Sequence, residues 1–376
     1  MMEVLFAISA LAIFVGVVIW GGYPVGVWVL SRLRGDELTR RDPAVPPLVS
    51  VIFATRDSDA SIDDRVVNLL DTDHPAAALE IVVALDAEPG SRPAVEESAA
   101  QRGLRVVYAT SPGGKALSLN AGVHAATGEI LVMADCAQRY DRRTIPELVA
   151  HLEDQRFGAV SGALELGNSQ RLTPVGLYWR LEKWLRYHEG RVHSTVGVTG
   201  AVYGVRRALW PQLPAGTLLD DVYVPMSLVL RGHRVGFTYH ARAVDTRHLD
   251  SRAEAARKSR TLTGVLQLCQ LMPAILSRNN PIRVQFIMHK LARLATPALL
   301  ILIVATSLGG LAPLAYAHPG TLARALGAAT TLIALVPPLR RGLVSIVLWI
   351  VRLQGAVASA LRNGVRRHWS VWNSKL

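Results

Sequence analysis

The chain has 376 residues, of which 41 are Lys or Arg and 29 are Asp or Glu, so its net charge is +12. Hydrophobic residues make up 50% and charged residues only 19%, which excludes a disordered chain and indicates that part of the chain lies in lipid. The positive charge is not accompanied by a nucleic-acid-binding motif, and aromatic residues make up only 6%, so we expect no nucleic-acid partner.

The first predicted element is a membrane anchor at residues 1–31. Residues 5–30 contain no charged side chain and exceed the roughly 20 residues that a spanning helix needs. A cleaved signal peptide is the alternative, but Glu3 stands where a basic residue would be expected, and no clear small-residue cleavage site follows. Four arginines come directly after the apolar run and place the next segment in the cytoplasm: Arg32, Arg34, Arg40 and Arg41.

Residues 45–262 are predicted to form an α/β domain. Short apolar runs of strand length alternate there with longer mixed segments, as in a largely parallel sheet that is buried on both faces. The runs that we expect to be strands are 47–55, 79–86, 104–110 and 129–135, and the helices between them include 63–70 and 115–126.

Residues 263–294 are predicted to be amphipathic interfacial helices, because basic side chains alternate with apolar positions between Val284 and Leu294. A C-terminal transmembrane region at 295–361 follows. Within it, residues 295–317 and 321–339 are expected to form a helical hairpin that returns to the cytoplasm.

The end of this region is less uniform. Residues 343–361 include Arg352 and Gln354, so this stretch can span the membrane, re-enter it or lie at its interface. The basic tail, 362–376, is expected to be cytoplasmic. Together these segments predict a multi-pass protein of the cell membrane with a cytoplasmic α/β domain.

Polar residues at the carboxyl ends of the predicted strands are the first candidates for a binding site. They are Thr55-Arg56-Asp57, Asp86, the loop 112–115 and Asp135. Neither GxGxxG nor GxxxxGK[ST] occurs at these ends, so neither a dinucleotide site nor a P-loop is supported.

Each of these groups has a structural alternative. Asp86 can accept hydrogen bonds from a nucleobase or ribose, or it can form an ordinary turn. The Gly-Gly-Lys sequence at 113–115 can bring backbone amides and an ammonium to a diphosphate, although it is a short pattern. Asp135 can hold a divalent ion against phosphate oxygens, or it can end its strand as a turn residue.

Longer motifs in a fixed order carry a family resemblance over residues 49–294. They include PLVSVIFATRDS, LEIVVALD, GGKALSLNAGVHAATGEILVMADC, FGAVSGALEL, LYWRLEKWLRYHEGRVHSTVGVTGAVYGVRRALW, LLDDVYVPMSLVLRGHRV and RKSRTL. The chain resembles the membrane-bound family 2 glycosyltransferases, inverting enzymes that include the synthases of cellulose, hyaluronan, chitin and poly-N-acetylglucosamine. The resemblance implies a GT-A fold, an α/β, Rossmann-like nucleotide-sugar-binding domain in the cytoplasm, with N- and C-terminal transmembrane helices.

The resemblance also implies a donor site and a divalent metal. Asp86 is similar to the aspartate beside the uracil, and Lys115 is similar to the lysine near the diphosphate. Asp135 is similar to the first aspartate of the DxD motif, which would bind Mg²⁺ or Mn²⁺. The other implied donor residues are Thr55 and Arg56 at the first strand, and Arg257 and Arg260 in a motif similar to RxxR.

An acceptor site and a general base are implied in the same way. Thr199-Gly200-Ala201 is similar to the segment that lines the acceptor site, and Asp220-Asp221 stands where the family has its acidic pair. Asp221 is therefore implied to take the proton of the acceptor hydroxyl. The same pair can instead be a helix N-cap with a favourable charge at the helix N-terminus, and Pro225 is then expected to be tolerated only in the first turn.

The sequence departs from the family pattern in the donor motifs. DxD is Asp135-Cys136-Ala137 here, so the second carboxylate is missing, and Thr261 stands where the RxxR motif ends in Trp. Cys136 has no base partner and is not expected to be a nucleophile. Four aromatic residues fall near helical spacing, which fits a core or interfacial face as well as a sugar-stacking platform: Tyr178, Trp179, Trp184 and Tyr187.

These features imply an inverting sugar transfer from a nucleotide donor, with UDP as the expected nucleotide, to a glycan or lipid acceptor at the cytoplasmic membrane face. Polysaccharide synthesis for the cell envelope and transfer of a single sugar both remain open. Besides donor, acceptor and membrane lipid, the expected partners are further copies of the chain or subunits of a synthase. The alternative is a donor-impaired homologue that acts as a non-catalytic scaffold or binding subunit of a glycan synthase complex.

Overall fold

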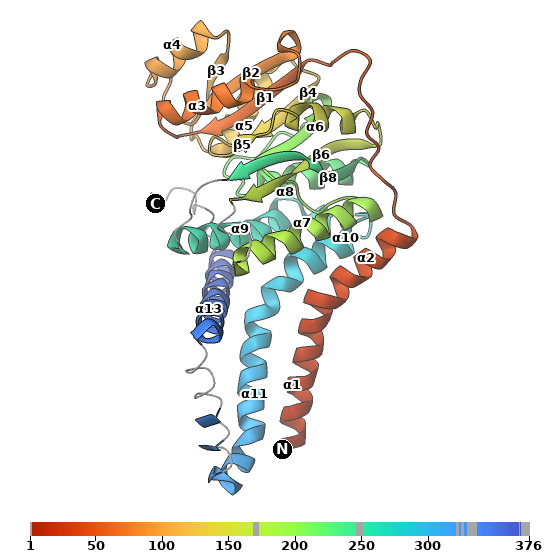
Figure 1. Cartoon of the computed structure of the whole chain (residues 1–376), viewed down its shortest axis with the longest axis vertical. Coiled ribbons are helices and arrows are strands. Elements are labelled where there is room, and N and C mark those ends of the chain that lie inside the picture. Colours follow the sequence, from red (N-terminus) through yellow and green to blue (C-terminus); the bar gives the residue numbers. More distant parts are fainter. Residues whose placement is uncertain are drawn as a thin grey trace.

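The computed structural model describes residues 2–167, 173–245, 251–320, 323–324, 327–328, 337–367 and 369. An α/β domain occupies one end of the molecule, and long helices lead away from it (Figure 1). Two helices of the domain, α7 (Pro174–Val192) and α9 (Ser251–Leu271), lie between the sheet and these long helices. They therefore separate the sheet from the long helices.

The domain contains an eight-stranded sheet in the order β3-β2-β1-β4-β7-β6-β8-β5. The four strands β3, β2, β1 and β4 run parallel to one another, as the sequence predicts, whereas β7 is antiparallel to both β4 and β6. The strand bounds are β1 Val49–Thr55, β2 Leu79–Leu85, β3 Arg105–Tyr108, β4 Ile130–Ala134, β5 Arg139–Tyr140, β6 Phe157–Leu166, β7 Val202–Arg206 and β8 Arg234–Asp245.

Helices cover both faces of this sheet, which explains why its strands are continuous apolar runs. Ile52 packs into the core on one face, while its neighbours Val51 and Phe53 pack into the core on the other. The predicted helices 63–70 and 115–126 are present as α3 and α5. The domain helices besides α7 and α9 are α3 Asp59–Leu70, α4 Pro93–Gln101, α5 Lys115–Ala125, α6 Thr144–Leu152 and α8 Asp220–Leu230.

The start of α8 differs from the expected N-cap. Leu219 occupies the cap position without a side-chain cap, and Asp220 and Asp221 are the first two helical residues. Pro225 lies inside the helix, so the expectation that it is confined to the first turn is wrong. A proline cannot bond the carbonyl four residues earlier. Here the backbone N–H of Val198 donates to the carbonyl of Asp221 at 2.9 Å, so that acceptor is satisfied.

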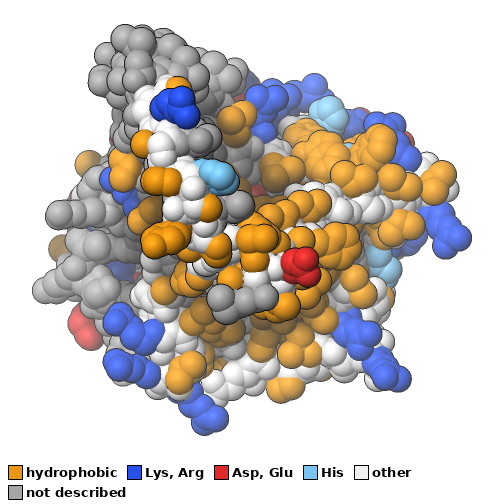
Figure 2. All heavy atoms as spheres, turned by 90° about the horizontal axis from the view of Figure 1, so that it is seen from below, with side chains coloured by type: hydrophobic (Ala, Val, Ile, Leu, Met, Phe, Trp, Pro, Cys, Tyr) orange, Lys and Arg blue, Asp and Glu red, His pale blue; other side chains and the backbone are white. Residues whose placement is uncertain are grey.

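Two helical stretches, 2–33 and 283–313, are long and apolar enough to cross a membrane, a criterion that a buried core helix or a signal sequence also meets. Seen from the end of the molecule opposite the α/β domain, hydrophobic side chains gather over the face, with Lys and Arg towards its rim (Figure 2). The elements of these stretches are α1 Met2–Val17, η1 Val18–Gly22 and α2 Tyr23–Leu33, then α10 Arg283–Phe286, η6 Ile287–Leu291, η7 Ala292–Ala295 and α11 Thr296–Ala317.

Helices α1 and α11 pack side by side through small residues (Figure 1). The hydroxyls of Ser9 and Ser307 are 2.8 Å apart, and a Cβ added to Gly310 would lie 3.0 Å from the ring of Phe6. Small residues let two apolar helices approach closely, as in membrane helix pairs.

The C-terminal helix α13 spans Pro337–Val365 and packs against α9 near its end. Asn363 donates to the hydroxyl of Thr263 at 3.4 Å, and Ala356, Val357 and Ala360 are buried. Residues 343–361 thus belong to one longer helix, and most of the predicted hairpin segment 321–339 lies outside the described residues. The predicted boundary between 262 and 263 falls inside α9.

The packing of α5 on the sheet yields a stability prediction. A Cβ at Gly122 would lie 2.6 Å from Cγ2 of Ile52, so we expect Gly122→Ala to destabilise the fold by about 1–3 kcal/mol. Helix propensity alone would favour alanine by about 1 kcal/mol. Thermal unfolding followed by tryptophan fluorescence measures the sign. Gly26→Ala in α2, where nothing lies within 4 Å, is the control, and an unchanged or raised unfolding temperature for Gly122→Ala would contradict the prediction.

Candidate active site

One cavity of about 570 Å³ opens at the carboxyl ends of β1, β2 and β4 and extends along α7, α8 and α9. It gathers side chains that the sequence places in separate donor and acceptor motifs. Arg257 is the exception, because its side chain lies outside the described part of the structure. The predicted site residues that line the cavity are Thr55, Arg56, Asp86, Lys115, Asp135, Thr199, Gly200, Ala201, Asp220, Asp221 and Arg260.

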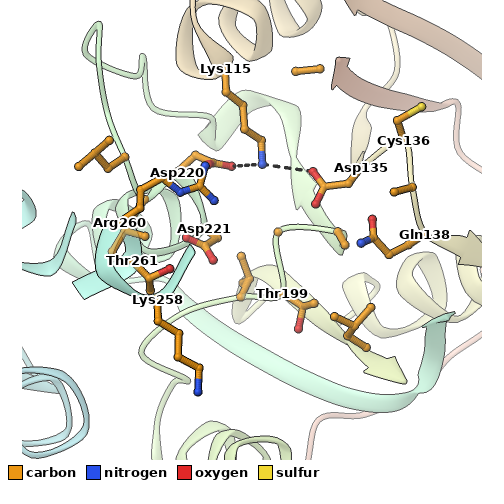
Figure 3. A pocket seen from close by; sticks show the side chains of 18 of the residues that line it. Lys115, Asp135, Cys136, Gln138, Thr199, Asp220, Asp221, Lys258, Arg260 and Thr261 are labelled. Carbon is orange, nitrogen blue, oxygen red and sulfur yellow. Dashed lines mark hydrogen bonds and ion pairs between the residues drawn. The ribbon is translucent and has the colours of Figure 1, made fainter. Parts of the chain in front are cut away.

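Lys115 places a cation on the cavity wall between two carboxylates. Its Nζ lies 3.2 Å from Oδ1 of Asp135 and 3.5 Å from Oδ2 of Asp220 (Figure 3). Burial lowers the pKa of Lys115, but the carboxylates of Asp135, Asp220 and Asp221 outweigh this effect and keep the pKa above its usual value. The ammonium therefore remains charged, and it is available to a negatively charged ligand.

Asp86 fixes the loop that precedes Lys115. Its Oδ1 accepts a hydrogen bond of 2.8 Å from the backbone N–H of Gly114, and its other oxygen pairs with the guanidinium of Arg56. Gly113 and Gly114 both have positive φ, and a Cβ on Gly113 would lie 2.8 Å from the Asp86 carboxylate. The turn and ligand-binding interpretations of Asp86 are thus compatible, because the carboxylate shapes the loop and also borders the cavity.

The acidic pair at the start of α8 divides into two environments. Asp220 is buried and paired with Lys115, whereas no hydrogen bond or ion pair joins the Asp221 carboxylate to the described residues. Burial, and then the charge of Asp220, raise the pKa of Asp221 to about 6, although Lys115 and Arg186 act in the opposite direction. A carboxylate with a pKa close to neutrality that borders a cavity can serve as a general base.

The predicted acceptor segment forms a wall whose polar groups are already bonded. Thr199 donates its hydroxyl to the carbonyl of Gly162 at 3.0 Å, and this hydroxyl accepts a bond of 3.2 Å from Arg186. A Cβ on Gly200 would lie 3.4 Å from Cβ of Asp221, so Gly200 lies close to the Asp221 side chain. This segment therefore positions Arg186 and Asp221.

The aromatic residues of α7 separate into two groups. Tyr178 and Trp179 line the cavity, and the ammonium of Lys258 lies 4.9 Å from the centre of the Tyr178 ring. Trp184 instead packs against a small core with Tyr23. The same helix therefore supplies both a cavity face and a core face.

The cavity residues that escaped the sequence analysis include Gln138, Glu182, Arg186 and Lys290. Glu182 and Arg186 follow Tyr178 at intervals of four residues, so the helical spacing that singled out the aromatic residues could also have found them. Lys290 reaches the cavity from the segment before α11, and no local pattern connects it to the site.

The residues present fit a divalent cation in part. Within the described residues, no group of three or more His, Cys, Asp or Glu side chains could hold a metal ion. Asp135 offers a carboxylate at the cavity wall, and buried Gln138 has an amide oxygen without a hydrogen-bond donor. Both are the oxygen ligands that Mg²⁺ and Mn²⁺ prefer. Burial raises the pKa of the Cys136 thiol to about 11, which agrees with its rejection as a nucleophile.

Two solved structures illustrate what this arrangement is similar to. The mannosyltransferase PcManGT from Pyrobaculum calidifontis, in complex with GDP-Man and Mn²⁺, matches with a TM-score of 0.71 and 24% identity, over 98% of this chain and 100% of that chain. Glucosyl-3-phosphoglycerate synthase from Mycobacterium tuberculosis matches with a TM-score of 0.42 and 17% identity, over 60% of this chain and 79% of that chain. The first likeness shows that the fold is GT-A-like.

No curated protein matches the chain by sequence. The family described as "Glycosyltransferase like family 2" matches residues 46–266, which is more than half of the chain and includes nearly all of the predicted catalytic domain. The chain therefore belongs to the glycosyltransferase-like family 2.

Proposed function

We propose that the protein is an inverting glycosyltransferase that moves a sugar from a nucleotide donor, with UDP as the expected nucleotide, to a hydroxyl of a glycan or lipid. The observation that carries this proposal is the acidic pair at Lys115. One carboxylate, Asp220, is paired with the ammonium, and the other, Asp221, borders the same cavity with a pKa near neutrality. An in-line displacement needs this combination of a base and a fixed positive charge.

The proposed reaction uses a base for the acceptor hydroxyl and positive charges for the departing diphosphate. Asp221 removes the proton of the acceptor hydroxyl as its oxygen attacks the anomeric carbon, and the nucleoside diphosphate departs with the bonding electrons. Lys115 and Arg260 lie on the cavity wall, where their positive charges stabilise the departing diphosphate. A divalent cation held by Asp135 would supply further positive charge at the diphosphate when bound.

The acceptor is proposed to enter from the side of the apolar helices. Arg186 and Lys290 line that part of the cavity, and Lys290 belongs to η6, which leads through η7 into α11. Exposed apolar side chains on the long helices, such as Phe14 (63% exposed) and Ile301 (69%), suit burial in lipid. Arg32 and Arg34 at the end of α1–α2 favour a cytoplasmic catalytic domain at a multi-pass membrane anchor.

The first prediction concerns turnover. Nucleotide release by the detergent-purified chain should occur with one or few sugars from a panel of UDP- and GDP-linked donors, measured with Mn²⁺, with Mg²⁺ and with EDTA. Asp221→Asn removes the base, so we expect release to fall by at least about 100-fold. Asp64→Asn is the matched control, since its side chain is 75% exposed and does not line the cavity.

Two outcomes would contradict the proposal. Equal loss in Asp221→Asn and Asp64→Asn would show that the effect is not specific to the base. Nucleotide binding without turnover, in the presence of glycan and lipid acceptors and partner subunits, would favour the scaffold role that the missing second DxD carboxylate also supports.

The second prediction concerns stability and pH. Because the pKa of Asp221 is raised from its ordinary value of 3.8 to about 6, the folded protein binds this proton more tightly than the unfolded chain does. The stabilisation of the folded protein by this proton is complete below the pKa of 3.8 that Asp221 has in the unfolded chain, and it is lost as the pH rises through about 6. Above that pH, the ionised Asp221 carboxylate costs the folded protein roughly 2–3 kcal/mol.

Asp221→Asn should therefore raise the thermal unfolding temperature at about pH 8, and the gain should shrink towards about pH 4.5. Thermal unfolding of the purified protein at both pH values measures this difference, with Asp64→Asn as the control. A difference that does not change with pH would contradict the raised pKa of Asp221.

A further inference from the structure

Gln138 is a buried polar side chain with one unused hydrogen-bonding atom. It is 4% exposed, lines the cavity and lies three residues after Asp135, just before β5 (Figure 3). Its Nε2 donates to Oδ2 of Asp245 at 2.9 Å, whereas its Oε1 has no hydrogen-bond partner among the residues that the structure describes. A buried acceptor without a partner is costly, and it indicates that a donor or a cation is missing beside it.

The carboxylate of Asp245 determines which end of the amide is unpaired. Asp245 is 3% exposed, and an ionised carboxylate only accepts hydrogen bonds, so the amide must present its NH₂ group to it. The oxygen of Gln138 is then turned away from Asp245. Lys115 pairs with Asp135 and Asp220, and within the described residues it makes no hydrogen bond to this oxygen.

The unpaired oxygen of Gln138 can take the place of the carboxylate that the DxD motif lacks in this chain. The family has a second carboxylate where this chain has Ala137, which also lines the cavity but carries no ligand atom. Hard divalent cations accept amide oxygens as well as carboxylates. A neutral ligand contributes less charge, so a cation held in this way depends more strongly on the phosphate oxygens of the nucleotide.

We propose that Oε1 of Gln138 is the second protein ligand, with Asp135, of a Mg²⁺ or Mn²⁺ ion that binds together with a nucleoside diphosphate, and that it replaces the carboxylate missing at Ala137. The proposal rests on the proposed function for the presence of a nucleotide at this end of the cavity. It assigns Asp245 as the positioning residue that orients the amide.

The test measures metal binding without turnover. Mn²⁺ binding to the detergent-purified full chain is followed by electron paramagnetic resonance, in parallel with UDP and with GDP. Gln138→Met keeps the length of the side chain but removes the oxygen, and we expect Mn²⁺ affinity to fall about tenfold while nucleotide affinity in EDTA stays unchanged. Gln155→Met, at an exposed glutamine outside the cavity, is the control and should bind Mn²⁺ as the wild type does.

A rescue variant separates metal binding from a purely structural role. Ala137→Asp restores the family carboxylate, so we expect it to tighten Mn²⁺ binding in the wild-type background and to recover the affinity lost in Gln138→Met. If Gln138→Met lowers the thermal unfolding temperature but leaves Mn²⁺ affinity unchanged, Gln138 only supports Asp245 and the proposal is overturned.

The remaining outcomes distinguish this proposal from the proposed function. Wild-type protein that binds UDP or GDP in EDTA but shows no Mn²⁺ binding with either nucleotide overturns the metal assignment and leaves the glycosyltransferase proposal standing. Protein that binds neither nucleotide, with or without Mn²⁺, overturns both.

Discussion

The ammonium of Lys115 lies between the carboxylates of Asp135 and Asp220, and this contact joins the end of β4 to the first residues of α5 and α8. Without the cation, two carboxylates from different elements would face the same cavity at a cost in like-charge repulsion and desolvation. Lys115 reaches these carboxylates from the loop at Gly113-Gly114. Asp86 fixes this loop by accepting a hydrogen bond from the Gly114 amide. The positions of Asp86, Lys115, Asp135 and Asp220 on the cavity wall are therefore coupled.

A second buried network joins the catalytic domain to the apolar helices. His289 bonds Glu182 and Glu189 at 2.8 Å each, Tyr23 donates to Glu189, and Arg293 donates to Glu182. Buried charges need such pairing, since removal of one partner is strongly destabilising. Burial raises the pKa of Glu182, but the positive groups His289 and Arg293 hold the pKa well below its usual value. Because Glu182 also lines the cavity, the segments that lead into the apolar helices help to fix the cavity wall.

The sequence was sufficient for the parallel half of the sheet, because strands buried on both faces are recognisable as apolar runs that end in Asp86 and Asp135. It also led to Lys115, Asp135, Asp220 and Asp221 on the cavity wall, since the family motifs are long. It was insufficient where a side chain depends on a distant partner. Pro225 inside α8 requires the Val198 amide to satisfy the Asp221 carbonyl, and the orientation of Gln138 requires Asp245. Such tertiary pairings leave no local pattern in either segment.

The two members of the acidic pair have different roles because only one of them meets the cation. Pairing with Lys115 fixes the Asp220 carboxylate beside Asp221, and Asp220 contributes to the raised pKa of Asp221, while Lys115 limits that rise. A donor diphosphate beside Lys115 would add negative charge and weaken this limiting effect. The divalent cation that we propose to bind with the diphosphate would act in the opposite direction, so the pKa of Asp221 in a donor complex would depend on both charges. On the proposed function, the contact of Lys115 with the acidic pair would thus link donor binding to the basicity of Asp221.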